Sequence, residues 1–277
     1  MLRLLWQELK FRRNAIIGWG LGLSFFPVVY VGIYPEFAEQ MSMFEDLMDL
    51  AIYQAMGISM AGFEGYMAST VLNFIPLLLS IYAIINGTAT LAGEEEDGKL
   101  ELVVTLPTPR WQIVTVKALA LAIALLVILI ISSLGEALTL ASIQDAVETD
   151  VTPSGAFFTL LGAYPLALTF GMISLFLGAF TPRRRIASMI AAAIIAVSYL
   201  GNNLAGMITS LESIENLFLF HYFDATETAF ANGQAAGDLA VLFGISLVAF
   251  GLALFFFQQR DITVGQWPWQ RARAASV

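Results

Sequence analysis

Long apolar stretches alternate with short polar ones along the chain. A helix needs about 20 apolar residues to cross a bilayer, and six stretches reach that length. They cover residues 14–34, 68–91, 113–140, 156–180, 186–208 and 236–257. The pattern predicts an all-α polytopic membrane protein with six transmembrane helices in a single domain, residues 1–277.

Three further segments do not fit a spanning helix. Residues 1–13 mix leucines and a tryptophan with basic side chains, which is typical of an N-terminal amphipathic helix at the membrane interface. Residues 35–67 carry acids without Lys or Arg, yet their apolar residues recur at helical spacing. We therefore expect an amphipathic helix outside the bilayer there. Residues 209–235 hold only a short apolar run, which favours a re-entrant or surface-lying segment before the sixth span.

Two glycines of the first span, Gly18 and Gly22, form a GxxxG pair. Such a pair allows a neighbouring helix to approach closely. Glycine is also frequent in membrane helices generally, so the pair has an alternative explanation without any close neighbour.

Composition supports a membrane protein and excludes several kinds of chemistry. Hydrophobic residues make up 58% of the chain and charged residues 13%, whereas a soluble domain is about half apolar and a quarter charged. The chain has no cysteine, which rules out disulfides and thiolate metal sites. His221, the only histidine, lies beside Phe220 and Tyr222, which favours a packing or interfacial role. Because no metal-ligand spacing and no nucleophile with a base is present, we predict no metal, no cofactor and no catalytic site in this chain.

The basic residues are distributed unevenly. All 13 Lys and Arg fall in residues 1–13, 93–117, 183–185 and 260–273, four segments that a six-span topology places on one side of the membrane. The three opposite loops contain none. Under the positive-inside rule, both termini are cytoplasmic in a multi-pass protein of the cell (plasma) membrane.

The predicted spans contain few ionisable residues. Among them are Lys117 and Glu136, near opposite ends of the third span. Proton- and ion-driven carriers place such residues at membrane depth, because a buried charge is costly and persists only for function. Their scarcity disfavours an ion-coupled secondary carrier and leaves the source of energy for transport outside the spans.

One match to a known motif is misleading. Gly93 to Lys99 has the G-x-x-x-x-G-K spacing of a phosphate-binding loop. A phosphate cradle needs a preceding strand, free backbone N–H groups and a Ser or Thr after the lysine. Here four acids would face the phosphates, a membrane helix precedes the segment and Leu100 replaces the hydroxyl. We reject a nucleotide site in this chain.

The polar segment 93–117 between the second and third spans has a helical pattern of its own. Its acids at 94–97 either begin a helical turn, where they would complement the positive end of the helix dipole, or simply solvate the end of the second span. Pro107 ends the apolar stripe that follows, and Thr108 and Pro109 suit the N-cap and first position of the next helix. The stripe consists of Leu100, Val103, Val104 and Leu106. We predict a short amphipathic helix that either lies across the cytoplasmic mouth of the bundle or rests in the headgroups.

This segment resembles the cytoplasmic signature of ABC-2 type transporter permeases. The matching residues are Glu94, Gly98, Leu100, Glu101, Leu106, Pro107, Arg110 and Lys117. The sequence departs from the family at Lys99, where Thr is usual, and any role of that hydroxyl is lost here. The closing residues 257–261 and the overall plan of six spans are also similar to the family.

The resemblance implies a permease domain without catalytic activity, the membrane subunit of an ATP-binding cassette transporter. A separate ATPase subunit would bind the ATP and dock on a coupling helix in residues 93–117. A second permease protomer, identical or related, and the lipid bilayer would be its other partners, with no nucleic acid. The residues that we assign to ATPase coupling are Glu94, Gly98, Leu100, Glu101, Val103, Pro107 and Arg110.

Export of an amphiphilic or hydrophobic substrate is the direction that the resemblance favours. Two alternatives stay open at this stage. A non-transporting membrane scaffold or immunity subunit would keep the same docking segment, and an ion-coupled secondary carrier would work without an ATPase.

Overall fold

The structure is a computed structural model, and it describes residues 1–40, 62–97, 109–181, 183–206 and 208–259. Within these ranges the chain is helical and contains no strand. Six helical stretches are long and apolar enough to cross a membrane. They are Leu2–Ala38, Gly62–Glu96, Arg110–Ala146, Pro153–Phe180, Arg184–Ala205 and Ala236–Gln259. The predicted all-α polytopic fold with six spans is confirmed.

The first helix, α1 (Leu2–Gln40), includes the predicted amphipathic lead and the first span without interruption. No glycine or proline separates Arg13 from the apolar run, and so nothing in the sequence ends the helix there. The lead is therefore not a separate interfacial element. The predicted outer helix of residues 35–67 coincides with described residues only at its ends, because residues 41–61 lie outside the described part of the chain.

The second membrane helix is built from consecutive helical segments. They are α4 (Gly62–Met67), η2 (Ala68–Leu72), α5 (Ile75–Thr88), η3 (Ala89–Gly93) and α6 (Glu94–Glu96). The segments η2 and η3 are π-helical turns, which are rare and frequently found at functional sites. The acids at 94–96 extend the foot of this span and do not begin a new helix.

The third membrane helix, α8 (Arg110–Ile143), is followed by the short η4 (Gln144–Ala146). It starts one residue later than expected, because Pro109 is extended and serves as the N-cap. The fourth is broken at residues 162–163 into α9 (Pro153–Leu161) and α10 (Tyr164–Phe180). The Thr152 hydroxyl accepts from the Gly155 N–H and caps α9, whose first residue is a proline.

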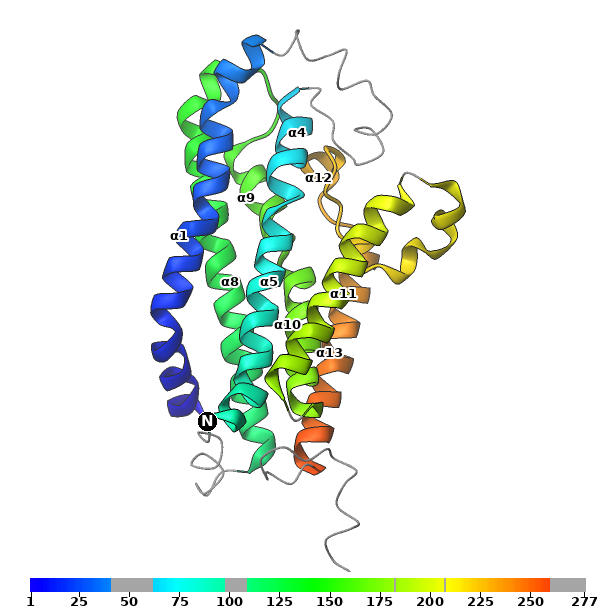
Figure 1. Ribbon diagram of the computed structural model, residues 1–277. Coiled ribbons are helices and arrows are strands. Elements are labelled where there is room, and N and C mark those ends of the chain that lie inside the picture. Colours follow the sequence, from blue (N-terminus) through cyan, green and yellow to red (C-terminus); the bar gives the residue numbers. More distant parts are fainter. Residues whose placement is uncertain (41–61, 98–108, 182, 207, 260–277) are drawn as a thin grey trace, which may run out of the picture.

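The chain between the fifth and sixth spans forms short helices. The fifth span is α11 (Arg184–Ala205), and the sixth is α13 (Ala236–Gln259). The segments between them are η5 (Thr209–Leu217), η6 (Leu219–Tyr222) and α12 (Thr228–Asn232). In Figure 1, η5 extends sideways from the bundle (yellow). Whether this segment enters the bilayer, as its re-entrant interpretation requires, stays a prediction.

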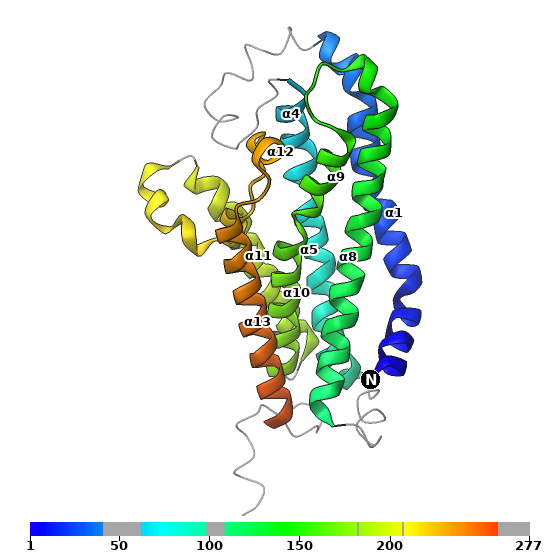
Figure 2. The same ribbon diagram turned by 180° about the vertical axis from the view of Figure 1, so that it is seen from behind.

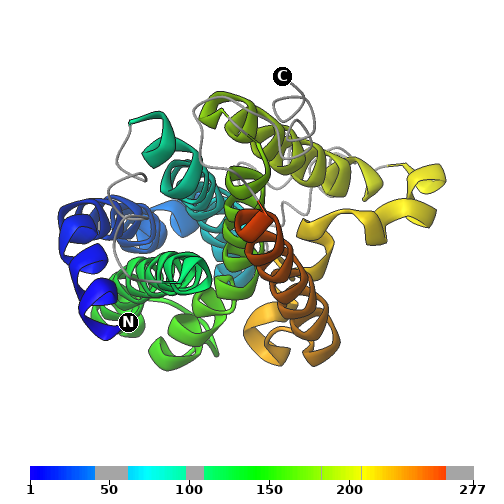
Figure 3. The same cartoon turned by 90° about the horizontal axis from the view of Figure 1, so that it is seen from below.

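Helix contacts divide the bundle into two parts. The helices α1 and α8 form one close pair, and α10 packs against α5 and α13 in the other part. Viewed along the bundle, α1 and α8 lie on one side and α11 and α13 on the other, with α5 and α10 between them (Figure 3). The helix α9 packs against the C-terminal half of α8, as the rear view shows (Figure 2).

The α1–α8 contact depends on glycines other than the predicted pair. A Cβ at Gly20 would lie 2.7 Å from Ile131 Cδ1, and one at Gly135 would overlap the Ser24 hydroxyl. A Cβ at Gly18 or Gly22 would meet no atom within 4 Å. The GxxxG pair therefore makes no close contact with a described neighbour of α1.

The two ends of the bundle differ in charge. We call the end where α1 begins and α13 ends the basic end, because every described Lys and Arg lies there (Figure 1). The opposite end holds α4, α9, η5, η6 and α12, none of which contains Lys or Arg, whereas α4 and η5 contain acids, among them Glu64 and Glu215. The foot of the second span and the beginning of α8 meet at the basic end.

Candidate functional site

The predicted coupling segment is only partly described. Glu94 and Arg110 flank it at the basic end of the bundle. The other residues assigned to ATPase coupling lie outside the described residues. They are Gly98, Leu100, Glu101, Val103 and Pro107. The described part of the site is therefore the pair of helix ends from which the segment emerges.

Lys117 connects these helix ends to α1. Its side chain is only 3% exposed, two helical turns into α8. The Nζ atom donates to both carboxylate oxygens of Glu94 at 2.6 Å and to Oε1 of Glu8 at 3.0 Å. An ammonium group has three N–H donors, and these three bonds use all of them. The buried charge therefore has a carboxylate from the second span and another from α1.

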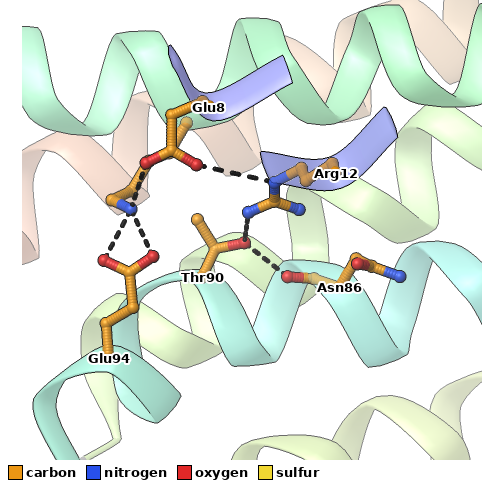
Figure 4. Close-up of polar contacts among 6 residues, drawn as sticks. Glu8, Arg12, Asn86, Thr90 and Glu94 are labelled. Atoms are coloured by element: carbon orange, nitrogen blue, oxygen red, sulfur yellow. Dashed lines mark hydrogen bonds and ion pairs between the residues drawn. The ribbon is translucent and has the colours of Figure 1, made fainter. Parts of the chain in front are cut away.

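Arg12 extends the same arrangement. Its Nε lies 3.5 Å from Glu8 Oε2, one helical turn away, and an Nη atom donates to the Thr90 hydroxyl at 2.8 Å. Thr90 in turn donates to the Asn86 carbonyl, one turn earlier in the same helix. Figure 4 shows these contacts together. We call Glu8, Arg12, Glu94 and Lys117 the four-charge cluster. Its two cations and two anions balance.

The position of Glu94 explains why it needs Lys117. Glu94 follows the π-helical turn η3 at the C-terminal end of the second span. The C-terminal end of a helix carries a partial negative charge, which disfavours an acid. Of the two alternatives for these acids, the one in which they begin a new helical turn is therefore wrong for Glu94. The Lys117 ammonium supplies the compensating charge.

Glu96 connects the same C-terminal end of the second span to the fifth span. Glu96 Oε1 accepts from the backbone N–H of Arg184 at 2.8 Å, in the first turn of α11. A carboxylate there satisfies a free N–H group and matches the positive end of the α11 dipole. One turn along, the hydroxyls of Thr88 and Ser188 are hydrogen-bonded at 2.9 Å. The foot of the second span is thus fixed to α1, α8 and α11.

Arg110 begins α8 and reaches the last span. Its guanidinium donates to the carbonyl of Gln258 at 3.4 Å, at the C-terminal end of α13. A cation is favourable at this end of a helix.

Sequence reasoning missed Glu8, Arg12 and Thr90. One signal for Glu8 was present, because it is the single acid among the basic residues of the lead. A lysine inside a span requires a carboxylate partner; Glu94 is 23 residues from Lys117 in the sequence, whereas Glu8 is 109 residues away. Only the packing of α1 on α8 shows that Lys117 bonds to both.

A second polar region lies at the opposite end. A pocket of about 600 Å³ is bordered by α11, η6 and the beginning of α13. Its lining includes Asn73, Asn202, Asn203, Glu215, His221 and Asp238. In the described ranges, no three His, Asp or Glu side chains are arranged to hold a metal ion. The Tyr199 hydroxyl donates to the Asn73 amide oxygen at 3.5 Å, a link between the fifth and second spans.

Comparison with known proteins identifies the family. A family model described as ABC-2 family transporter protein matches residues 2–262, nearly the whole chain. In a comparison with curated proteins, none matched the chain. The match agrees with the resemblance of residues 94–117 and with the six spans, because it covers both. Proteins of this family are membrane permeases of ABC transporters, generally non-catalytic subunits that associate with an ABC ATPase. The chain belongs to the ABC-2 family of transporter proteins.

Proposed function

We propose that this chain is the permease subunit of an exporter, driven by a separate ATPase that docks on residues 93–117. The observation that carries the proposal is the bonding of Lys117 to both Glu94 and Glu8. Glu94 lies within the segment predicted to receive the ATPase, six residues before Leu100, where its apolar stripe begins. A displacement of that segment would act on α1 and α8 through one buried ammonium.

The helix ends around the segment favour transmission to the rest of the bundle. Glu96 bonds to the first turn of α11, and Arg110 bonds to the last turn of α13. Force on the docking segment would therefore reach four spans besides the second. Closure of the ATPases on ATP would bias two packings of these spans and open a path for the substrate.

The outer faces of the last two spans suit lipid and a second protomer. Large apolar side chains are exposed on α11 and α13 and have no neighbour within the described chain that covers them. They include Met189, Val197, Leu200, Leu247, Val248 and Phe255. Apolar faces of this kind require hydrocarbon or another helix. The proposed unit is a dimer of permeases, identical or related, with a cytoplasmic basic end and an amphiphilic or hydrophobic cargo.

Affinity purification from native membranes in mild detergent tests the docking. We expect an ABC ATPase to co-purify with the wild-type chain and to be lost when Leu100 and Val103 are both changed to Asp. The control is Ile214→Asp, an equally apolar side chain exposed at the opposite end. If no ATPase accompanies the wild-type chain, the proposal fails and an ion-coupled carrier gains support.

A second measurement separates transport from scaffolding. In vesicles that contain the purified complex, a transported substrate should stimulate ATP turnover. Replacing Glu101 or Arg110 by Gln should lower this stimulation while membrane insertion and complex formation persist. A complex whose ATP turnover no amphiphile stimulates would instead favour a non-transporting scaffold or immunity subunit.

A further inference from the structure

Glu136 is a buried acid that the docking site does not use. It lies on α8 and is fully buried, and neither carboxyl oxygen has a hydrogen-bond partner among the described residues. One helical turn earlier, Ser132 and Ser133 are also fully buried, and their hydroxyls likewise lack a partner in the described chain. Residues three and four positions apart share a helix face. These three polar side chains therefore form one group, which we call the Glu136 group.

The helices around α8 provide no charge for this group. The elements packed against α8 are α1, α5, α9, α10, α13 and η4. Away from the basic end, the ionisable side chains that the structure describes on these elements are Tyr30, Tyr34, Glu36, Tyr82, Tyr164, Asp238 and Asp145. None of them bonds to Glu136, and α9 has no ionisable residue. The cations of α1 lie at the basic end, as does Lys117, roughly 28 Å away along α8 at 1.5 Å per residue.

A carboxylate in this position would be uncompensated. An ionised group in a water-free interior needs a counter-charge or several donors, and otherwise it takes up a proton and becomes neutral. The close contact of Gly135 with Ser24, next to Glu136, leaves α1 tightly packed on α8. The described packing is therefore compatible with a neutral carboxyl and incompatible with an ionised one.

We propose that Glu136 is a proton-binding site whose occupancy follows the packing of α8, so that a proton is bound in this packing and released when the helices around the group separate. The hydroxyls of Ser132 and Ser133 would then donate to the ionised carboxylate, because they lie one turn away on the same face. Movement of the helices would then be coupled to the binding and release of a proton, near the end of α8 that is opposite Lys117. This step does not require the docking proposed above.

The absence of cysteine allows a direct test. Leu140 is fully buried one turn after Glu136, and Leu140→Cys places a single thiol beside the group. The purified full-length chain in lipid vesicles is treated with N-ethylmaleimide over a range of pH, with and without Glu136→Gln. Both chains carry the same cysteine, so the ratio of their labelling rates removes the effect of pH on the thiol itself.

The expected result is a pH dependence that belongs to Glu136. If one proton is released on opening, the labelling rate relative to the Glu136→Gln chain should rise by up to about tenfold per pH unit while the carboxyl titrates. The Gln side chain keeps the shape and stays neutral, so a purely structural role would give identical pH profiles. Identical profiles would overturn the proposal.

An infrared measurement keeps the proposal testable if the variant does not fold. The wild-type chain should show the C=O stretching band of a protonated carboxyl that is sheltered from water at neutral pH. Glu8→Gln should leave that band unchanged, because Glu8 is an ionised partner of Lys117. Absence of the band in the wild-type chain would show an ionised Glu136 and contradict the proposal.

Discussion

Lys117 and Glu136 are two ionisable side chains buried on the same helix, yet their surroundings differ completely. Lys117 donates three hydrogen bonds to two carboxylates, and Arg12 balances the remaining charge. Glu136 has no hydrogen-bond partner in the described chain. The first group can keep its charge inside the bundle, whereas the second cannot do so in this packing.

The comparison separates two uses of a buried ionisable residue. A paired charge fixes the geometry of the elements that it joins, although burial makes its net contribution to stability small. In this chain it joins the foot of the second span to α1 and α8, next to the predicted docking segment. An unpaired acid fixes nothing, and its protonation instead depends on whether the packing remains closed.

The largest effect should follow from breaking the paired site. In Lys117→Met the apolar stem remains, but Glu94 and Glu8 lose their shared cation. Removing one partner of a fully buried ion pair costs about 3–5 kcal/mol, and we expect about 2–3 kcal/mol because both carboxylates are about a quarter exposed. The measurement is the free energy of unfolding from thermal denaturation, with the purified wild-type and variant chains compared in the same detergent.

A double variant provides the control for this change. Lys117→Met with Glu94→Gln leaves the Glu8–Arg12 pair intact and removes the excess negative charge. Most of the lost stability should return. If the double variant is no more stable than Lys117→Met alone, the cost arises from packing around Lys117 and not from its charge.

Much of the fold follows from the sequence, for physical reasons. The bilayer requires apolar helices of fixed length, so the six spans can be read from hydropathy alone. The continuity of α1 was missed because Arg12 and Arg13 suggest an interface, while a basic amphipathic helix and the first turns of a longer helix have the same pattern.

The site was predictable only in part. Glu94 and Arg110 were assigned through the resemblance of this segment to ABC-2 permeases, and the structure places them at the two helix ends that flank the predicted segment. Their bonds to Lys117 and Gln258 depend on how distant helices pack. No periodicity encodes that packing, since contacts such as Glu8 to Lys117 join positions more than a hundred residues apart.

The contact of α1 with α8 connects the two sites, and a glycine variant tests its tightness. In Gly135→Ala the new Cβ would overlap the Ser24 hydroxyl and lie 3.1 Å from Val28 Cγ2. Overpacking of this kind costs about 1–3 kcal/mol, and we expect about 1–2 kcal/mol because the hydroxyl can rotate away. Gly18→Ala is the control: it lies on α1, the partner of α8 in this contact, and a Cβ there would meet no atom within 4 Å, so the free energy of unfolding should change little. Equal effects of the two variants would contradict the described α1–α8 packing.

The smallest effect is also the most informative, because its sign should be opposite to that of Lys117→Met. Glu136→Leu replaces a buried side chain that has no partner by an apolar one of similar size. Removing a polar group that is left without hydrogen bonds relieves a desolvation penalty of about 1–3 kcal/mol. Because Ser132 and Ser133 stay without partners among the described residues, we expect the free energy of unfolding, measured by thermal unfolding, to rise by only about 1 kcal/mol. The variant should also lose any dependence of its stability on pH that Glu136 causes in the wild-type chain. A clear loss of stability would mean that the carboxyl group has a partner that stabilises the fold. Glu136 would then belong with Lys117, as a fixed structural charge.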